Sequence, residues 1–260
     1  MNKLRQVFGG KKAFIPYITA GDPSPETTEQ LIVGMSEAGA DLIEVGIPFS
    51  DPVAEGQVIQ NANIRALSAG MTTDRVFDIL RNVRKVCDVP IAVLTYANPV
   101  LAYDPEKFLK NCMETVVDAL IVPDLPYEEK EELAPSCRKY GISLISMVSP
   151  TSEKRIRMIA KEAEGFVYCV SSMGVTGIRK NIGDDVREII RLVKEVRDIP
   201  CAVGFGINTP EQAMKLTEFA DGIIVGSRIV KIIDEYGPDC VPHVAEYVRM
   251  MKKAVMSRGA

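Results

Sequence analysis

The sequence predicts a single (β/α)8 barrel, also called a TIM barrel, and three observations support this α/β fold class. Eight short runs rich in β-branched residues alternate with amphipathic helical stretches over nearly the whole chain. The runs are too apolar to leave one face in water, which is typical of a parallel sheet covered on both sides. The length of 260 residues suits one barrel, and no linker or low-complexity segment divides it, so we expect one domain over residues 1–260.

The expected strands and helices alternate in order along the chain. The strands cover residues 14–19, 41–45, 91–95, 119–122, 142–147, 166–170, 201–205 and 222–225. The helices cover residues 25–38, 73–86, 105–114, 127–139, 152–162, 184–196, 210–218 and 228–234. Three helices have clear start signals, because an N-cap residue precedes a proline at Pro25, Pro105 and Pro210.

Two features depart from a minimal barrel. The basic, amphipathic segment 1–12 lacks the apolar run of a secretory signal, so we expect a short leading helix there. About 50 residues separate the second strand from the third, against 20 to 35 elsewhere. This insertion predicts extra helices on the catalytic face. Its first part, residues 48–60, belongs to a βα loop, where barrel enzymes place their chemistry.

Composition excludes several classes of function. Lys plus Arg number 31 and Asp plus Glu 35, and no basic block suggests binding to nucleic acid or anionic lipid. No run approaches the roughly 18 apolar residues of a membrane span, so we expect a cytoplasmic protein. The six cysteines are scattered without a C-x-x-C pair, which predicts neither a metal nor a redox site. Because His243 is the only histidine, acid-base chemistry must fall to carboxylates, tyrosine or lysine.

Two carboxylates are candidates for that chemistry. Glu44 interrupts the apolar second strand, where burial would raise its pKa toward the range useful for proton transfer. A core salt bridge is the alternative interpretation. Glu55 lies in the loop eleven residues later and could meet Glu44 above one pocket, although Asp51 competes for the same role.

Glycine-bearing turns follow the sixth, seventh and eighth strands and predict a phosphate site. They are Gly174–Gly177, Gly204–Gly206 and Gly226–Ser227. Glycine lets backbone N–H groups approach an anion, and a helix that begins after Gly226 would direct its positive end to the same point. Any one of these glycines could serve only to let the backbone turn, but this explanation fits all three turns together poorly.

Several strings, in order from about residue 10 to residue 235, closely resemble the family of tryptophan synthase α subunits. They are Phe14–Pro23, Glu44–Pro52, Tyr96–Pro99, Val122–Pro126, Gly174–Gly177 and Gly204–Ile207. The resemblance implies a lyase of tryptophan biosynthesis that cleaves indole-3-glycerol phosphate into indole and glyceraldehyde 3-phosphate by a reverse aldol reaction, without a cofactor. It also implies an allosteric α2β2 heterotetramer with a β subunit.

The resemblance further assigns roles to residues. Glu44 acts as general acid-base, and Tyr168 lies beside the reacting groups. Glu55 occupies the position of an aspartate that hydrogen-bonds the indole N–H, so one extra methylene is a departure from the family. Thr176 is expected to contact this acid on loop closure. The remaining roles are an indole pocket at Leu94, Tyr96 and Phe205, and a phosphate site at Gly177, Gly206, Gly226 and Ser227.

For the β subunit, the expected docking segments are residues 48–60, residues 96–103 and the neighbourhood of Pro126. Two other interpretations remain open. One is a different phosphate-binding barrel, such as a prenyl-glyceryl phosphate synthase or an indole lyase that works without a partner. The other is a non-catalytic barrel that binds ligand and activates a β subunit, which the departure at Glu55 keeps open. Indole release by the isolated chain distinguishes the last interpretation from an enzyme.

Overall fold

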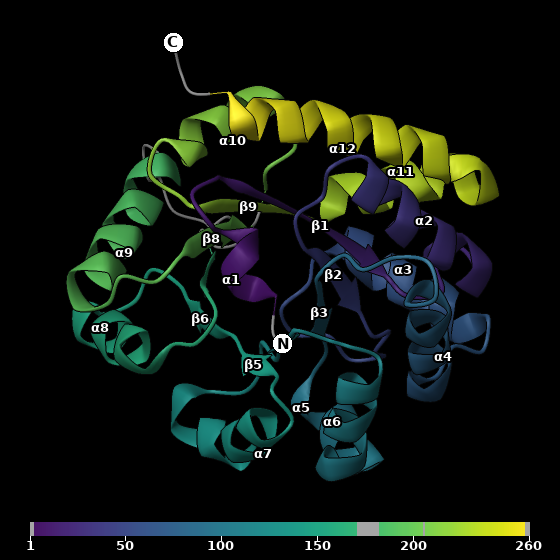
Figure 1. Cartoon of the computed structure of the whole chain (residues 1–260), viewed down its shortest axis with the longest axis horizontal. Helices are drawn as coiled ribbons and strands as arrows, with labels where there is room; N and C mark the ends of the chain where they lie inside the picture. The colour runs from purple at the N-terminus through teal and green to yellow at the C-terminus, as the bar shows by residue number, and fades with distance from the viewer. Residues whose placement is uncertain (1–2, 171–181, 205, 258–260) are drawn as a thin grey trace.

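The computed structural model describes residues 3–170, 182–204 and 206–257, and in them parallel strands form a barrel wall surrounded by helices (Figure 1). The order of strands around the wall is β5-β4-β3-β2-β1-β9-β8-β7-β6. Their bounds are β1 Ala13–Thr19, β2 Ile43–Gly46, β3 Ile91–Leu94, β4 Ala119–Ile121, β5 Ser143–Leu144, β6 Ser146–Val148, β7 Val167–Val170, β8 Cys201–Gly204 and β9 Gly222–Val225. The predicted fold class is confirmed.

The predicted fifth strand is split into β5 and β6, which corrects the sequence prediction of one continuous strand. Leu144 pairs with β4, and Ser146 pairs with β7. Between them, Ile145 donates its N–H to the carbonyl of Leu120 at 2.9 Å. The barrel is therefore closed by one continuous segment, whose first part pairs with β4 and whose second part pairs with β7.

The predicted helices are present, one of them in two pieces, together with helices that lie outside the predicted ranges. Their bounds are α1 Leu4–Val7, α2 Pro25–Glu37, α3 Gln57–Ser68, α4 Thr73–Val83, α5 Ala97–Tyr103, α6 Pro105–Glu114, η1 Tyr127–Glu132, α7 Ala134–Lys139, α8 Glu153–Glu162, α9 Ile182–Val196, α10 Pro210–Thr217, α11 Ser227–Tyr236, η2 Gly237–Asp239 and α12 Cys240–Met256. The single helix expected over residues 127–139 is a 3-10 turn followed by α7. The three proline-marked starts are confirmed by side-chain caps from Ser24, Asp104 and Thr209.

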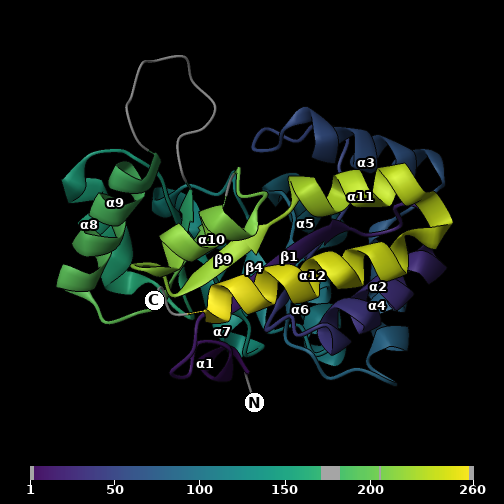
Figure 2. The same cartoon turned by 90° about the horizontal axis from the view of Figure 1, so that it is seen from above.

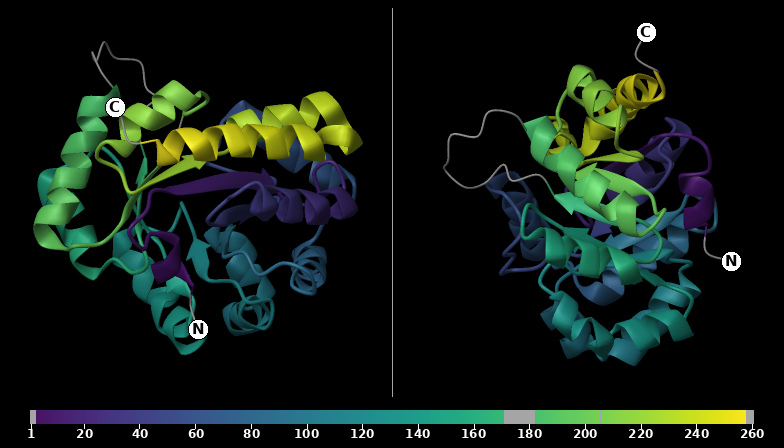
Figure 3. Two further views of the ribbon diagram at one scale, coloured as in Figure 1. Left: turned by 45° about the horizontal axis from the view of Figure 1, so that its top comes forward. Right: turned by 90° about the vertical axis from the view of Figure 1, so that its left-hand side faces the viewer.

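The C-terminal helix α12 was not among the predicted elements. It packs across α2 and α11 on the outside of the barrel, as the yellow helix in Figure 3 shows. His243 lies on its exposed side, where its ring stacks on Tyr236 with centroids 3.7 Å apart. The only histidine is therefore a surface residue.

Strand side chains divide the core into two apolar clusters. On β1, Ile15 and Tyr17 belong to the cluster inside the barrel, whereas Phe14 and Ile18 belong to the layer between strands and helices. Period-two alternation explains this division. Leu4 and Val7 of α1 belong to the inner cluster, so α1 closes one end of the barrel. Figure 2 shows α1 on the opposite side of the sheet from α3, so the loops after the strands lie at the other end.

None of the helices in the described ranges is both long and apolar enough to cross a membrane.

Candidate active site

Glu44 lies on β2 with its side chain inside the barrel. Its neighbours Ile43 and Val45 belong to the outer layer, and across the sheet it is level with Tyr17 on β1 and Ala92 on β3. The residue is 1% exposed, and its Oε2 has no hydrogen-bond partner within the described ranges. Burial, with a smaller contribution from the charge of Glu55, raises the pKa of Glu44 to about 8. The group is therefore protonated at neutral pH.

This environment gives no support to a core salt bridge at Glu44 and favours a role in proton transfer. A core salt bridge would stabilise the carboxylate and lower the pKa, but no Lys or Arg pairs with Glu44 within the described ranges. A carboxyl group that is buried, unpaired and shifted toward neutral pH is suited to proton transfer.

Glu55 lies in the loop between β2 and α3 and is partly buried. Its Oε2 accepts a hydrogen bond from Asn63 Nδ2 at 2.7 Å. Burial raises the pKa of Glu55, and hydrogen bonds from Asn63 and Tyr96 act against that rise. Asp51, the competing acid, is exposed and accepts a hydrogen bond from Ser50. The structure thus brings Glu55, and not Asp51, toward Glu44.

Two tyrosines complete the polar part of the barrel mouth. Tyr168 on β7 and Tyr17 on β1 are both buried, which raises the pKa of each phenol well above its usual value. Tyr17 was not among the predicted site residues. Its position near the C-terminal end of β1, with the same inward alternation as Glu44 on β2, is the signal that could have found it. A Cβ at Gly46 or Gly204 would collide with these rings, so both strand ends need glycine.

One small cavity of about 90 Å³ joins these groups at the C-terminal ends of the strands. Its lining contains Glu44, Glu55, Tyr168, Leu94, Gly206, Gly226 and Ser227 from the predicted set, together with Tyr17. Tyr96 is buried behind the loop, where its hydroxyl accepts the N–H of Ala54 at 3.2 Å. Thr176, Gly177 and Phe205 lie outside the described residues.

The same cavity contains features suited to an anion. Ser227 is the first residue of α11 and Gly226 its N-cap, so free N–H groups and the positive end of the helix dipole meet at this end of the cavity. Gly206 has φ of 71°, a conformation that other residues rarely adopt. Neither Arg228 nor Lys231 lines the cavity.

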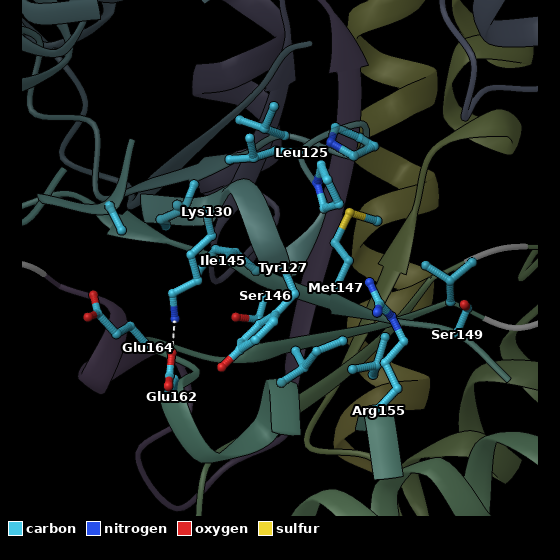
Figure 4. Close-up of a pocket in the computed structure, with 18 of the residues that line it drawn as sticks. Leu125, Tyr127, Lys130, Ile145, Ser146, Met147, Ser149, Arg155, Glu162 and Glu164 are labelled. Carbon is cyan, nitrogen blue, oxygen red and sulfur yellow. Dashed lines mark hydrogen bonds and ion pairs between the residues drawn. The ribbon is translucent and has the colours of Figure 1, made fainter. Parts of the chain in front are cut away.

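A larger cavity of about 430 Å³ lies beside this one, between the ends of β4–β6 and the helices η1, α7 and α8 (Figure 4). Its lining is largely apolar, and its edge includes the ion pair Lys130–Glu162 at 2.8 Å. It contains none of the described residues predicted for the site, and it meets the smaller cavity at Ala54. The candidate chemistry therefore belongs to the smaller cavity.

Comparison with known proteins identifies the family. The family model described as tryptophan synthase alpha chain matches residues 4–256. The chain belongs to this family. A tryptophan synthase alpha chain from Lacticaseibacillus casei is 45% identical over 255 residues, covering 98% of this chain and 96% of that protein. One from Halalkalibacterium halodurans is 48% identical over 237 residues, covering 90% and 89%.

Solved structures of tryptophan synthase agree over the whole fold. The alpha chain from Legionella pneumophila subsp. pneumophila superposes with a TM-score of 0.88 at 35% identity, covering 98% of this chain and 97% of that one. A chain from the a2b2 complex of Pyrococcus furiosus, described as mutually activated, gives 0.86 at 35% identity, covering 94% and 99%.

Proposed function

We propose that this alpha chain cleaves indole-3-glycerol phosphate to indole and glyceraldehyde 3-phosphate with Glu44 and Glu55 as its two working carboxylates. One observation carries the assignment of these residues. Glu44, Glu55 and the N-terminus of α11 line a single cavity at the mouth of the barrel. Two acids in different environments beside an anion site match a phosphorylated substrate that needs proton transfer and charge stabilisation.

The protonation state of Glu44 sets the order of steps. Because the pKa of Glu44 is raised to about 8, the neutral acid can donate its proton to ring carbon 3 of the indole. The ring becomes positively charged, and the Glu55 carboxylate accepts a hydrogen bond from the ring N–H. The Glu44 carboxylate then takes the proton of the glycerol hydroxyl nearest the ring. As the carbon–carbon bond breaks, its electrons return to the ring and an aldehyde forms, leaving Glu44 protonated again.

The other residues hold the substrate. The amides of Gly206, Gly226 and Ser227 bind the phosphate, with Gly177 expected to contribute from outside the described residues. Leu94 contacts the indole, and Tyr96 supports the loop that carries Glu55. Phe205 and Thr176, also outside the described residues, keep their expected roles beside the indole and against Glu55.

The partner of this chain is a tryptophan synthase β subunit, in an α2β2 complex like that of the Pyrococcus furiosus protein. We propose that residues 48–60, residues 96–103 and the segment near Pro126 form the docking surface, because they surround the cavity from which indole leaves. We also propose the cytoplasm as the place of the reaction. All six cysteines are free thiols, five of them buried, which fits a reducing compartment.

The substitution Glu44→Gln tests the proposal. It removes the proton-transfer group and nearly preserves volume, so indole release should fall by at least about 100-fold while substrate binding is kept. Glu37→Gln, at an exposed position on α2, is the matched control and should behave as wild type. Near-normal turnover of Glu44→Gln would end the assignment. Absence of indole release from wild type, with or without a β subunit, would instead favour the non-catalytic interpretation.

A further inference from the structure

Asn63 on α3 is an amide in an apolar setting. It is 2% exposed, and the other buried residues of this helix are Ala62 and Ala66. Its Nδ2 donates to Glu55, while its Oδ1 has no hydrogen-bond partner in the part of the chain that the structure describes. Burying an amide with one half unsatisfied costs stability. An apolar side chain would avoid this cost, so the amide needs a reason to be there.

We propose that Asn63 is a positioning residue that holds the Glu55 carboxylate, ionised, in the substrate cavity. The inference rests on the proposed function of Glu55 and extends it to a residue eight positions later in the chain. Asn63 does not line the cavity itself. It therefore acts through Glu55.

The start of α3 holds Glu55 at two points. Gln60 Nε2 donates to the backbone carbonyl of Glu55 at 2.8 Å, and Asn63 Nδ2 holds the carboxylate at 2.7 Å. Glutamate has one more rotatable bond than the aspartate of the family, so a free side chain would lose more entropy when it is ordered over the substrate. A tether from a helix reduces that loss before the substrate arrives.

The charges around Glu55 explain why the tether must be a donor. In the described part of the chain, the titratable groups that face it from neighbouring elements are Glu44 on β2, Tyr17 on β1 and Tyr96 at the start of α5, and none of them is a cation. Burial raises the pKa of Glu55, and the hydrogen bond from Asn63 is the first influence that opposes it. Without Asn63, Glu55 would take up a proton at higher pH. A protonated Glu55 cannot stabilise a positively charged ring.

The test compares Asn63→Leu with Asn61→Leu in the full chain. Asn61 is an exposed residue of the same helix, hydrogen-bonded only to Gln57 among the contacts of the described residues. Indole release is measured across the pH range. For Asn63→Leu we expect the acidic limb of kcat/KM to move to higher pH by about 1 pH unit. Most of the loss should be in kcat rather than KM. Asn61→Leu should keep the wild-type profile.

Two further variants guard against a merely structural effect. Asn63→Asp keeps the shape but replaces the donor with a second carboxyl group, so its acidic limb should move further than that of Asn63→Leu. In a Glu55→Gln background, Asn63→Leu should change kcat/KM by less than about twofold, because the group it positions is already gone. Unchanged profiles for both Asn63 variants, with wild type active, would overturn the inference and leave the proposed function intact. An inactive wild type would overturn the proposed function itself.

Discussion

Glu44, the proposed acid-base residue, lies where its ionised form would destabilise the fold. Its carboxyl group is buried on a strand among apolar neighbours, and one of its oxygens lacks a partner within the described residues. The native state holds the neutral form at little cost in free energy, whereas the ionised form would be destabilised by its burial. Its raised pKa is therefore also a statement about how stability depends on pH.

The stability of the chain should fall as Glu44 is forced to ionise. The pKa of Glu44 is about 8 in the folded chain, above the value of 4.5 that is usual for a glutamate side chain. Its contribution is therefore fully present below about pH 4.5 and is lost as the pH rises through about 8. Wild type should therefore lose roughly 3–5 kcal/mol of its free energy of unfolding between about pH 5 and pH 9, relative to Glu44→Gln, which has no group to titrate at this position. Urea unfolding at both pH values measures this. Parallel pH dependences in wild type and variant would contradict it.

Two helices, α3 and α11, position the groups that are proposed to bind the substrate. Helix α11 begins at the proposed anion site, helix α3 holds the loop that carries Glu55, and an ion-pair network joins the two helices. Arg65 on α3 binds the buried Asp22 with both its Nε and Nη2 at 2.8 Å, and reaches Asp234 on α11 with Nη1 at 2.8 Å. The loop after β1 therefore fixes the position of α3 relative to α11.

Breaking this network should destabilise the fold. Arg65→Met leaves the Asp22 carboxylate, 1% exposed, without its partner. We expect a loss of about 2–4 kcal/mol, below the usual cost for a fully buried pair because Arg65 is about a third exposed. Arg191→Met, which breaks exposed pairs within α9, should cost less than about 1 kcal/mol. Denaturant unfolding compares the two variants. Equal losses of stability would show that the Arg65 ion pairs contribute no more than exposed pairs.

The N-terminus of α11 should bind inorganic phosphate. Ser227→Asp places a carboxylate where the phosphate would lie, and an acid at a helix start preserves the helix. We expect the substitution to weaken phosphate binding by at least about 100-fold, and Ser227→Ala to weaken it by less than about tenfold. Calorimetric titration with phosphate measures both. Ser152→Asp at the start of α8 is the control. Normal phosphate binding by Ser227→Asp would place the anion elsewhere.

Exposed apolar residues lie at both ends of the barrel, but those at only one end fall within the proposed docking segments. Val53 and Leu101 lie in loops and helices that follow strands, at the end of the barrel that contains the cavity. Val86 and Val116 come just before strands and therefore lie at the opposite end. The first pair lies within the proposed docking segments. The partner that receives indole must contact the end from which indole leaves.

Leu101→Asp should weaken association with the β subunit, because a charge would be buried at the interface. We expect affinity to fall by about 10- to 100-fold, while indole release by the isolated chain is unchanged. Val86→Asp is the matched control. Size-exclusion chromatography with light scattering measures the complex. Partner binding should also change substrate affinity by roughly 5- to 150-fold, and Leu101→Asp should shift this effect to higher β-subunit concentration. A complex unaffected by Leu101→Asp would move the docking surface elsewhere.

Local patterns in the sequence were enough to predict the alternating elements and the proline-marked helix starts. Alternating apolar strands and helices predict the barrel, and the N-caps before Pro25, Pro105 and Pro210 mark helix starts because capping depends on residues close in the chain. The sequence also marks Glu44 as the one carboxylate in the interior of an apolar strand. These properties are local, so one sequence can reveal them.

Contacts between distant segments can be seen only in the folded chain. The split at Ile145 arises because two different strands bind the two halves of one segment. Helix α12 packs against α2, which lies about 200 residues before it in the chain. The choice of Glu55 over Asp51, the presence of Tyr17 beside Glu44, and the amide of Asn63 on Glu55 all depend on how a loop folds over the barrel mouth. Each of these contacts joins groups from different parts of the chain. Their distance in space is set by packing, which no local sequence pattern encodes.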